Sequence, residues 1–87
     1  MVIFINMPTI LRIGAYRFYF YSHEPNEPPH IHIDRDDSTA KFWLKPISLA
    51  SSIGFSAKEL RKLEELVQEN QTKLLEAWDG YFGSQSG

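Results

Sequence analysis

Hydrophobic and polar residues alternate through the first half of the chain and change to a helical spacing near residue 55. Four runs rich in β-branched and aromatic residues alternate in this way: TILRI (9–13), YRFYFY (16–21), HIHID (30–34) and AKFWL (40–44). Successive side chains of a strand point to opposite faces of a sheet, so each run predicts a short β-strand. We interpret residues 46–55 (PISLASSIGF) as a connector with room for a short fifth strand.

The connections between these runs favour antiparallel hairpins. A glycine and an alanine (14–15) separate the first two runs, and the sequence DDS (36–38) separates the last two. Pro28 and Pro29 precede the third run, where their missing N–H groups stay out of its hydrogen-bond ladder. The pattern predicts an antiparallel meander of about four strands.

Apolar residues recur at helical spacing after Ser56, which predicts the N-cap, and Glu59 completes a capping-box pattern. One helix over 57–82 would be about 39 Å long at 1.5 Å per residue, more than the width of so small a domain. We therefore predict a break near Asn70, with this residue as the N-cap of a second segment. The apolar stripe consists of Leu60, Leu63, Leu66, Val67, Leu74, Leu75, Trp78, Tyr81 and Phe82.

The two halves together predict an α+β fold, in which a small antiparallel β-meander packs one face on the C-terminal helical segments. A chain of 87 residues is too short to divide into two cores, so we expect one domain over 1–83. Residues 1–6 form an N-terminal extension if translation starts at Met7. The tail 84–87 is expected to be disordered.

Each predicted strand divides into an apolar and a polar set of side chains. The apolar set, which we expect to pack on the helical stripe, is Tyr16, Phe18, Phe20, Ile31, Ile33, Ala40, Phe42 and Leu44. The opposite set is Arg17, Tyr19, Tyr21, His30, His32, Asp34, Lys41, Trp43 and Lys45. We call these nine residues the histidine face and expect them to share one side of the sheet.

Composition and charge limit the partners of such a face. The formal net charge of −2 and the pI of about 5.8 argue against a general positive field for duplex DNA. The chain has no cysteine, so it can form neither a disulfide nor a thiolate metal site, and a reducing cytoplasm is expected. The sequence contains no apolar run long enough for a signal peptide or a membrane span.

The histidines suggest a metal-independent endoribonuclease as one interpretation. His30 and His32 leave the backbone about 6.6 Å apart on the same side of a strand, and imidazoles titrate in the range that suits a general acid and base. Such an enzyme would need no cofactor. Arg17, Lys41 or Lys45 would stabilise the developing negative charge, and Tyr19, Tyr21 and Trp43 would stack bases.

Two other interpretations use the same residues. In one, His30 and His32 bind zinc or another divalent ion, with Asp34 or His23 as a third ligand. In the other, the histidines are partly exposed strand residues, Asp34 pairs with a neighbouring cation, and the aromatic face docks a protein partner. We interpret the charged residues of the helix, including Glu59 and Lys62, as a solvated face.

The stretch MPTILRIGAYRFYFYSHEPNEPPHIHID, followed by AKFWLKP, GFSAKEL and LLEAWDGYFG, resembles the short prokaryotic proteins grouped as domain of unknown function 4160. The resemblance covers residues 7–83, and its EPPHIHI core falls on Pro28, Pro29, His30 and His32. It implies a standalone cytoplasmic protein whose gene neighbours that of another small protein, and hence a component of a toxin–antitoxin-type module. It transfers no catalytic residue.

We therefore expect a toxin-like or regulatory protein that acts on RNA or translation through the histidine face. The first alternative is a non-catalytic module that docks a cognate small partner encoded nearby, and the second is a histidine-ligated metal binder. The edge strands of so small a sheet need cover, which also allows a homodimer. No membrane partner is expected.

Overall fold

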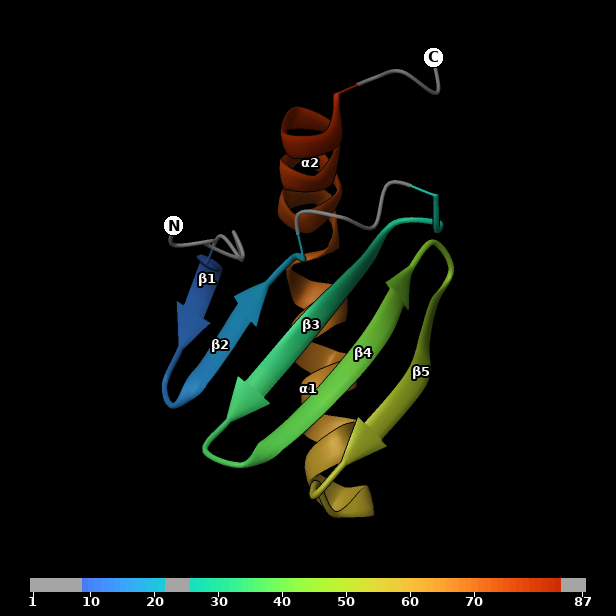
Figure 1. Ribbon diagram of the computed structural model, residues 1–87. Helices are drawn as coiled ribbons and strands as arrows, with labels where there is room; N and C mark the ends of the chain where they lie inside the picture. The colour runs from blue at the N-terminus through green and yellow to red at the C-terminus, as the bar shows by residue number, and fades with distance from the viewer. Residues whose placement is uncertain (1–8, 22–25, 84–87) are drawn as a thin grey trace.

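The computed structural model describes residues 9–21 and 26–83 (Figure 1). The expectations for the N-terminal extension with Met7, for His23 and for the tail 84–87 lie outside the described residues. Neither of the two described helices is long and apolar enough to cross a membrane.

The strands form one antiparallel sheet in the order of the chain, as the meander predicts. They are β1 Thr9–Ile13, β2 Tyr16–Tyr19, β3 His30–Arg35, β4 Ser38–Leu44 and β5 Ile47–Ile53. The sheet has five strands rather than about four, because the connector after β4 pairs along almost the whole of that strand. The β1–β2 turn contains Gly14 at φ 57°, and the β3–β4 turn contains Asp36 at φ 54°. Glycine and aspartate both tolerate this left-handed conformation.

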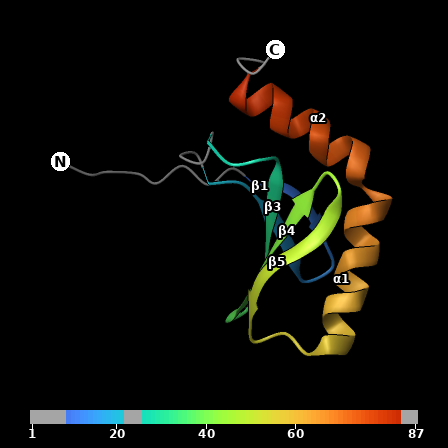
Figure 2. The ribbon, with the colours of Figure 1, turned by 90° about the vertical axis from the view of Figure 1, so that its right-hand side faces the viewer.

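The helical half breaks at Asn70, as predicted, into α1 (Ala57–Glu69) and α2 (Gln71–Phe82). Figure 2 shows that α2 continues in a different direction from α1 and leans over the end of the sheet where β3 begins. The Ser56 N-cap is confirmed, because its hydroxyl accepts the N–H of Glu59 at 3.1 Å.

The predicted role of Asn70 as a side-chain N-cap of α2 is wrong. Its side chain makes no cap hydrogen bond to α2, and its amide donates to the carbonyl of Leu66 at 2.8 Å. Its contribution to α2 comes from the backbone, because the Asn70 carbonyl accepts the N–H of Leu74 at 2.9 Å. The Leu66 carbonyl therefore accepts from both the side-chain amide and the backbone N–H of Asn70, whose nitrogen lies 3.2 Å away.

The apolar set of the strands is buried against the helices, as expected. The helices contribute four buried residues to this core, namely Leu63, Val67, Leu74 and Trp78. In Figure 2, α1 lies along one side of the sheet and α2 crosses over its end, so the histidine face lies on the side away from α1.

Candidate functional site

The strand register brings the histidine face together at the centre of the sheet. Tyr19 on β2 lies opposite His32 on β3, and His32 lies opposite Lys41 on β4. Two further pairs, Arg17 with Asp34 and His30 with Trp43, flank this central row. Lys45 follows the end of β4 and is exposed.

His30 is fully buried, with 0% of its surface exposed. Its ring centroid lies 4.9 Å from that of Trp78 on α2 and 5.7 Å from that of Trp43. Its Nδ1 is 2.9 Å from the carbonyl of Pro28. A carbonyl oxygen can only accept, so Nδ1 carries the proton and donates it. His30 thus joins the start of β3 to α2. The docking interpretation predicted that His30 would be a partly exposed strand residue, and this is wrong because α2 covers this end of the sheet.

His32 is nearly buried, with 8% of its surface exposed. Its ring stacks on Tyr19 at a centroid distance of 5.4 Å and meets the edge of Tyr21 at 4.4 Å. The His30 ring lies 5.1 Å away and almost perpendicular. Aromatic neighbours therefore surround the second imidazole as well as the first.

Tyr19 is buried and anchors the face to Asp34. Its hydroxyl donates to Asp34 Oδ1 at 3.0 Å, and the hydroxyl of Thr39 donates to the same oxygen at 2.7 Å. Burial, assisted by the Tyr21 hydroxyl and the Asp34 carboxylate, raises the pKa of Tyr19 well above its ordinary value. Tyr19 therefore remains a neutral hydrogen-bond donor at neutral pH. Because it is buried, it holds its neighbours in position and contributes little to the exposed surface of the face.

Two cations lie over aromatic rings of the face. The Arg17 guanidinium carbon is 4.5 Å from the centroid of Tyr19, and Lys41 Nζ is 4.6 Å from that of Trp43. Cation–π contacts of this kind hold a charged side chain against the sheet. Lys41 also donates to the Glu27 carboxylate at 2.5 Å, so its charge is paired.

The EPPH motif holds the start of β3 in place. Glu27 binds Lys41, the carbonyl of Pro28 accepts from His30, and the carbonyl of Pro29 accepts the N–H of Leu44 at 3.0 Å. Sequence reasoning missed Glu27, because it precedes the strand and so falls outside the alternation.

Thr39 is a second residue of the site that sequence reasoning missed. The alternation of Lys41 and Trp43, continued by two residues, would have placed Thr39 on the same face, but the predicted strand began at residue 40, two residues after the start of β4.

No three histidine, aspartate or glutamate side chains in residues 9–21 and 26–83 are grouped so that they could hold a metal ion. The Asp34 oxygen Oδ1 is occupied by the hydroxyls of Tyr19 and Thr39. His23, the other proposed ligand, lies outside the described residues. The part of the chain that is described therefore offers no three-ligand set for zinc.

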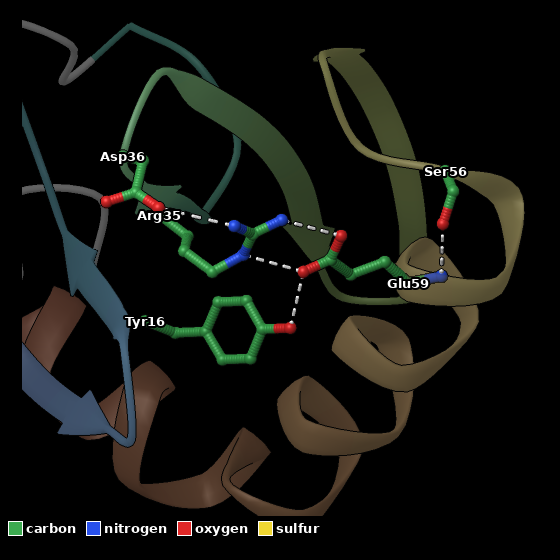
Figure 3. Close-up of polar contacts among 5 residues, drawn as sticks. All are labelled: Tyr16, Arg35, Asp36, Ser56 and Glu59. Carbon is green, nitrogen blue, oxygen red and sulfur yellow. Dashed lines mark hydrogen bonds and ion pairs between the residues drawn. The ribbon is translucent and has the colours of Figure 1, made fainter.

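A second polar cluster joins the sheet to the start of α1 (Figure 3). Arg35 on β3 makes two bonds to the Glu59 carboxylate, from Nε to Oε2 at 2.7 Å and from Nη2 to Oε1 at 2.8 Å. The Tyr16 hydroxyl donates to the same Oε2 at 2.8 Å. These bonds, from Arg35 first and Tyr16 second, lower the pKa of Glu59, and the carboxylate in turn raises the pKa of Arg35.

The predicted solvated role of Glu59 is therefore wrong, because its carboxylate reaches across to two strands. An open hollow of about 610 Å³ adjoins this cluster, lined by Tyr16, Glu59 and exposed charged residues of α1. These charges are of both signs, and Tyr16 already donates its hydroxyl to Glu59. We assign the cluster a structural role, because it attaches the start of α1 to the sheet.

One comparison with known proteins gives a match. A family model described as a domain of unknown function (DUF4160) matches residues 15–79. No match was found among curated proteins, and none among solved structures. The matched range begins just before β2 and ends within α2, so it includes the whole histidine face and Trp78.

Proposed function

The chain belongs to the DUF4160 family, and we propose that it is a non-catalytic binding module that docks a cognate small protein through the histidine face. In this proposal it is the regulatory or toxin-like component of a two-gene toxin–antitoxin-type module in a prokaryotic cytoplasm. A sequence without cysteine fits that reducing compartment.

The burial of the two imidazoles is the observation that carries the proposal. A general acid or base must come within hydrogen-bond reach of the substrate atom that gains or loses the proton. His30 has no exposed surface and His32 has 8%. The half-buried residues around them are Tyr21, Trp43, Lys41 and Arg17, and aromatic and arginine side chains are enriched at the centres of protein interfaces.

Charge also favours a protein partner over RNA. Lys41 is paired with Glu27, and the chain as a whole carries a formal charge of −2. Binding to a phosphate backbone depends on lysine and arginine side chains that displace the counterions of the phosphates. An aromatic patch whose lysine is already paired is better suited to an apolar protein surface.

We expect Trp43→Ala or Tyr21→Ala to weaken binding of the protein encoded by the neighbouring gene by about tenfold or more, as the loss of an interface aromatic does. Co-expression followed by calorimetric titration of the purified pair measures this. Tyr81→Ala is the matched control, because it removes an exposed aromatic ring from α2. Wild-type affinity in both Trp43→Ala and Tyr21→Ala would contradict docking through this face.

Action on RNA is the second candidate, favoured by the cation–aromatic pairs Arg17–Tyr19 and Lys41–Trp43. Its test is incubation of the untagged protein with total cellular RNA in excess chelator, beside His32→Ala. We choose His32 because substitution of the fully buried His30 would disturb the core. Cleavage by the wild type alone would replace docking with endoribonuclease activity, whereas intact RNA in both samples agrees with docking.

A further inference from the structure

β5 is an uncovered edge of the sheet. None of its seven residues, ISLASSI, is charged or a proline, and no described element lies on its outer side in Figures 1 and 2. Proteins usually protect an edge with charges, prolines, a short strand or a β-bulge. Both edge strands have a bulge, at Ile10 in β1 and at Ala50 in β5, so the bulges do not distinguish the two edges. The opposite edge, β1, is two residues shorter and carries Arg12. Of the two edges, β5 is therefore the one open to a further strand.

β5 also carries exposed apolar side chains. Leu49 is 42% exposed and Ile53 is 71% exposed, and they are two of the three large hydrophobic residues that are exposed in the described part of the chain. Leu49 pairs with Phe42, which faces the core, so it lies at the rim of the helix side. Ile53 pairs with Thr39, so it lies at the rim of the histidine face. A strand added to this edge would cover apolar surface on both sides.

We propose that a second copy of this chain occupies the edge, with the two β5 strands antiparallel about a two-fold axis. A strand without charged residues can pair with itself without placing like charges opposite each other. Pairing of β5 with itself closes after two copies, whereas pairing of β5 with β1 of the next copy would continue into a filament.

The middle of β5 fits a two-fold axis. Ala50 is the central residue of the strand and is skipped in the pairing with β4, so a bulge lies where the axis would pass. An axis at Ala50 places Leu49 opposite Ser51 of the second copy. The two Leu49 side chains then occupy diagonal positions on the helix side, a distance that long side chains can span. Each would then cover the other.

The arrangement joins two five-stranded sheets into one, with the two α1 helices on the same side. Both histidine faces would lie on the other side, with the two β4 strands about 14 Å apart, three times the usual strand spacing. The interface does not use the histidine face, so this inference stands independently of the proposed docking partner.

Light scattering coupled to size-exclusion chromatography of the full chain tests the proposal. We expect the mass of two chains for the wild type and of one chain for Leu49→Lys, because two lysines close to the axis would repel. Gln68→Lys adds the same charge on an exposed position of α1 and should remain a dimer. A single-chain mass for the wild type at the highest soluble concentration, or a dimer that Leu49→Lys leaves intact, would overturn it.

Cysteine cross-linking provides a readout that does not depend on how Leu49→Lys folds. The chain has no cysteine, so Ala50→Cys introduces a single thiol close to the axis. We expect a covalent dimer under mild oxidation with Ala50→Cys and none with Gln68→Cys. Equal cross-linking of the two variants would mean that the copies meet by collision and would also overturn the proposal.

Discussion

One carboxylate, that of Glu59, connects three elements of the molecule. It lies in the first turn of α1, accepts two bonds from Arg35 on β3 and accepts the hydroxyl of Tyr16 on β2. The capping-box pattern predicted that this side chain would turn back toward Ser56. The tertiary contacts instead hold both of its oxygens, and only the backbone N–H of Glu59 meets the Ser56 hydroxyl.

This contact predicts a loss of stability in acid. The pKa of Glu59 is lowered from 4.5 in the folded chain, so folding favours the ionised form. The resulting stability is fully present above the unfolded-state pKa and is lost as the pH falls through the lowered folded-state pKa. We expect Glu59→Gln to be less stable than the wild type at neutral pH and the difference to shrink below about pH 4.5.

Urea unfolding followed by circular dichroism at several pH values measures this difference. Glu65→Gln removes a negative charge from an exposed position on the same helix and is the control. A constant difference between Glu59→Gln and the wild type across the acid range would show that the Arg35 and Tyr16 bonds do not depend on ionisation.

The two helices are separate elements with different attachments. α1 lies along the sheet and is held at its start by Glu59. α2 leans over the end of the sheet, where Trp78 covers His30 and Gln71 donates to the carbonyl of Leu44 at 2.8 Å. The break at Asn70 is what allows the second half of the apolar stripe to reach the start of β3.

The Gln71 bond predicts the local stability of α2. We expect Gln71→Ala to lower the free energy of opening of α2 by about 1 kcal/mol, the usual net value of one hydrogen bond. Hydrogen exchange of the amides in 71–82 measures it, and the amides of α1 should change less. Thr72→Ala, at an exposed neighbouring position, is the control. Equal acceleration in both helices would mean that they open as one unit.

At the scale of the whole molecule, the described part of the sheet has one face covered by helices, one aromatic face and one edge strand, β5, without charges or prolines. If the chain dimerises through β5, the stability of the folded state depends on protein concentration, because association with a second folded chain stabilises the folded state. We expect the melting temperature of the wild type to rise with concentration and that of Leu49→Lys to stay constant. Calorimetry over a hundredfold range measures this, and a flat wild-type curve would contradict the dimer.

The sequence by itself determined the strand faces and the division into sheet and helices. Alternation and helical spacing are local properties, so Phe18, Ile33 and Leu63 could be placed in the core without knowledge of the fold. The existence of a break followed from the length of the helical segment, and its position at Asn70 followed from the preference of asparagine for helix starts. β5 is only weakly marked in the sequence, because ISLASSI alternates poorly and its pairing depends on β4.

Only the tertiary structure decided what surrounds the chemically important side chains. His30 has the alternation of a face residue, yet Trp78, far along the chain, buries it. Glu59 is spaced for Lys62 but binds Arg35 and Tyr16. Local spacing determines the direction in which a side chain leaves the backbone, whereas burial and hydrogen-bond partners depend on elements that only folding brings near.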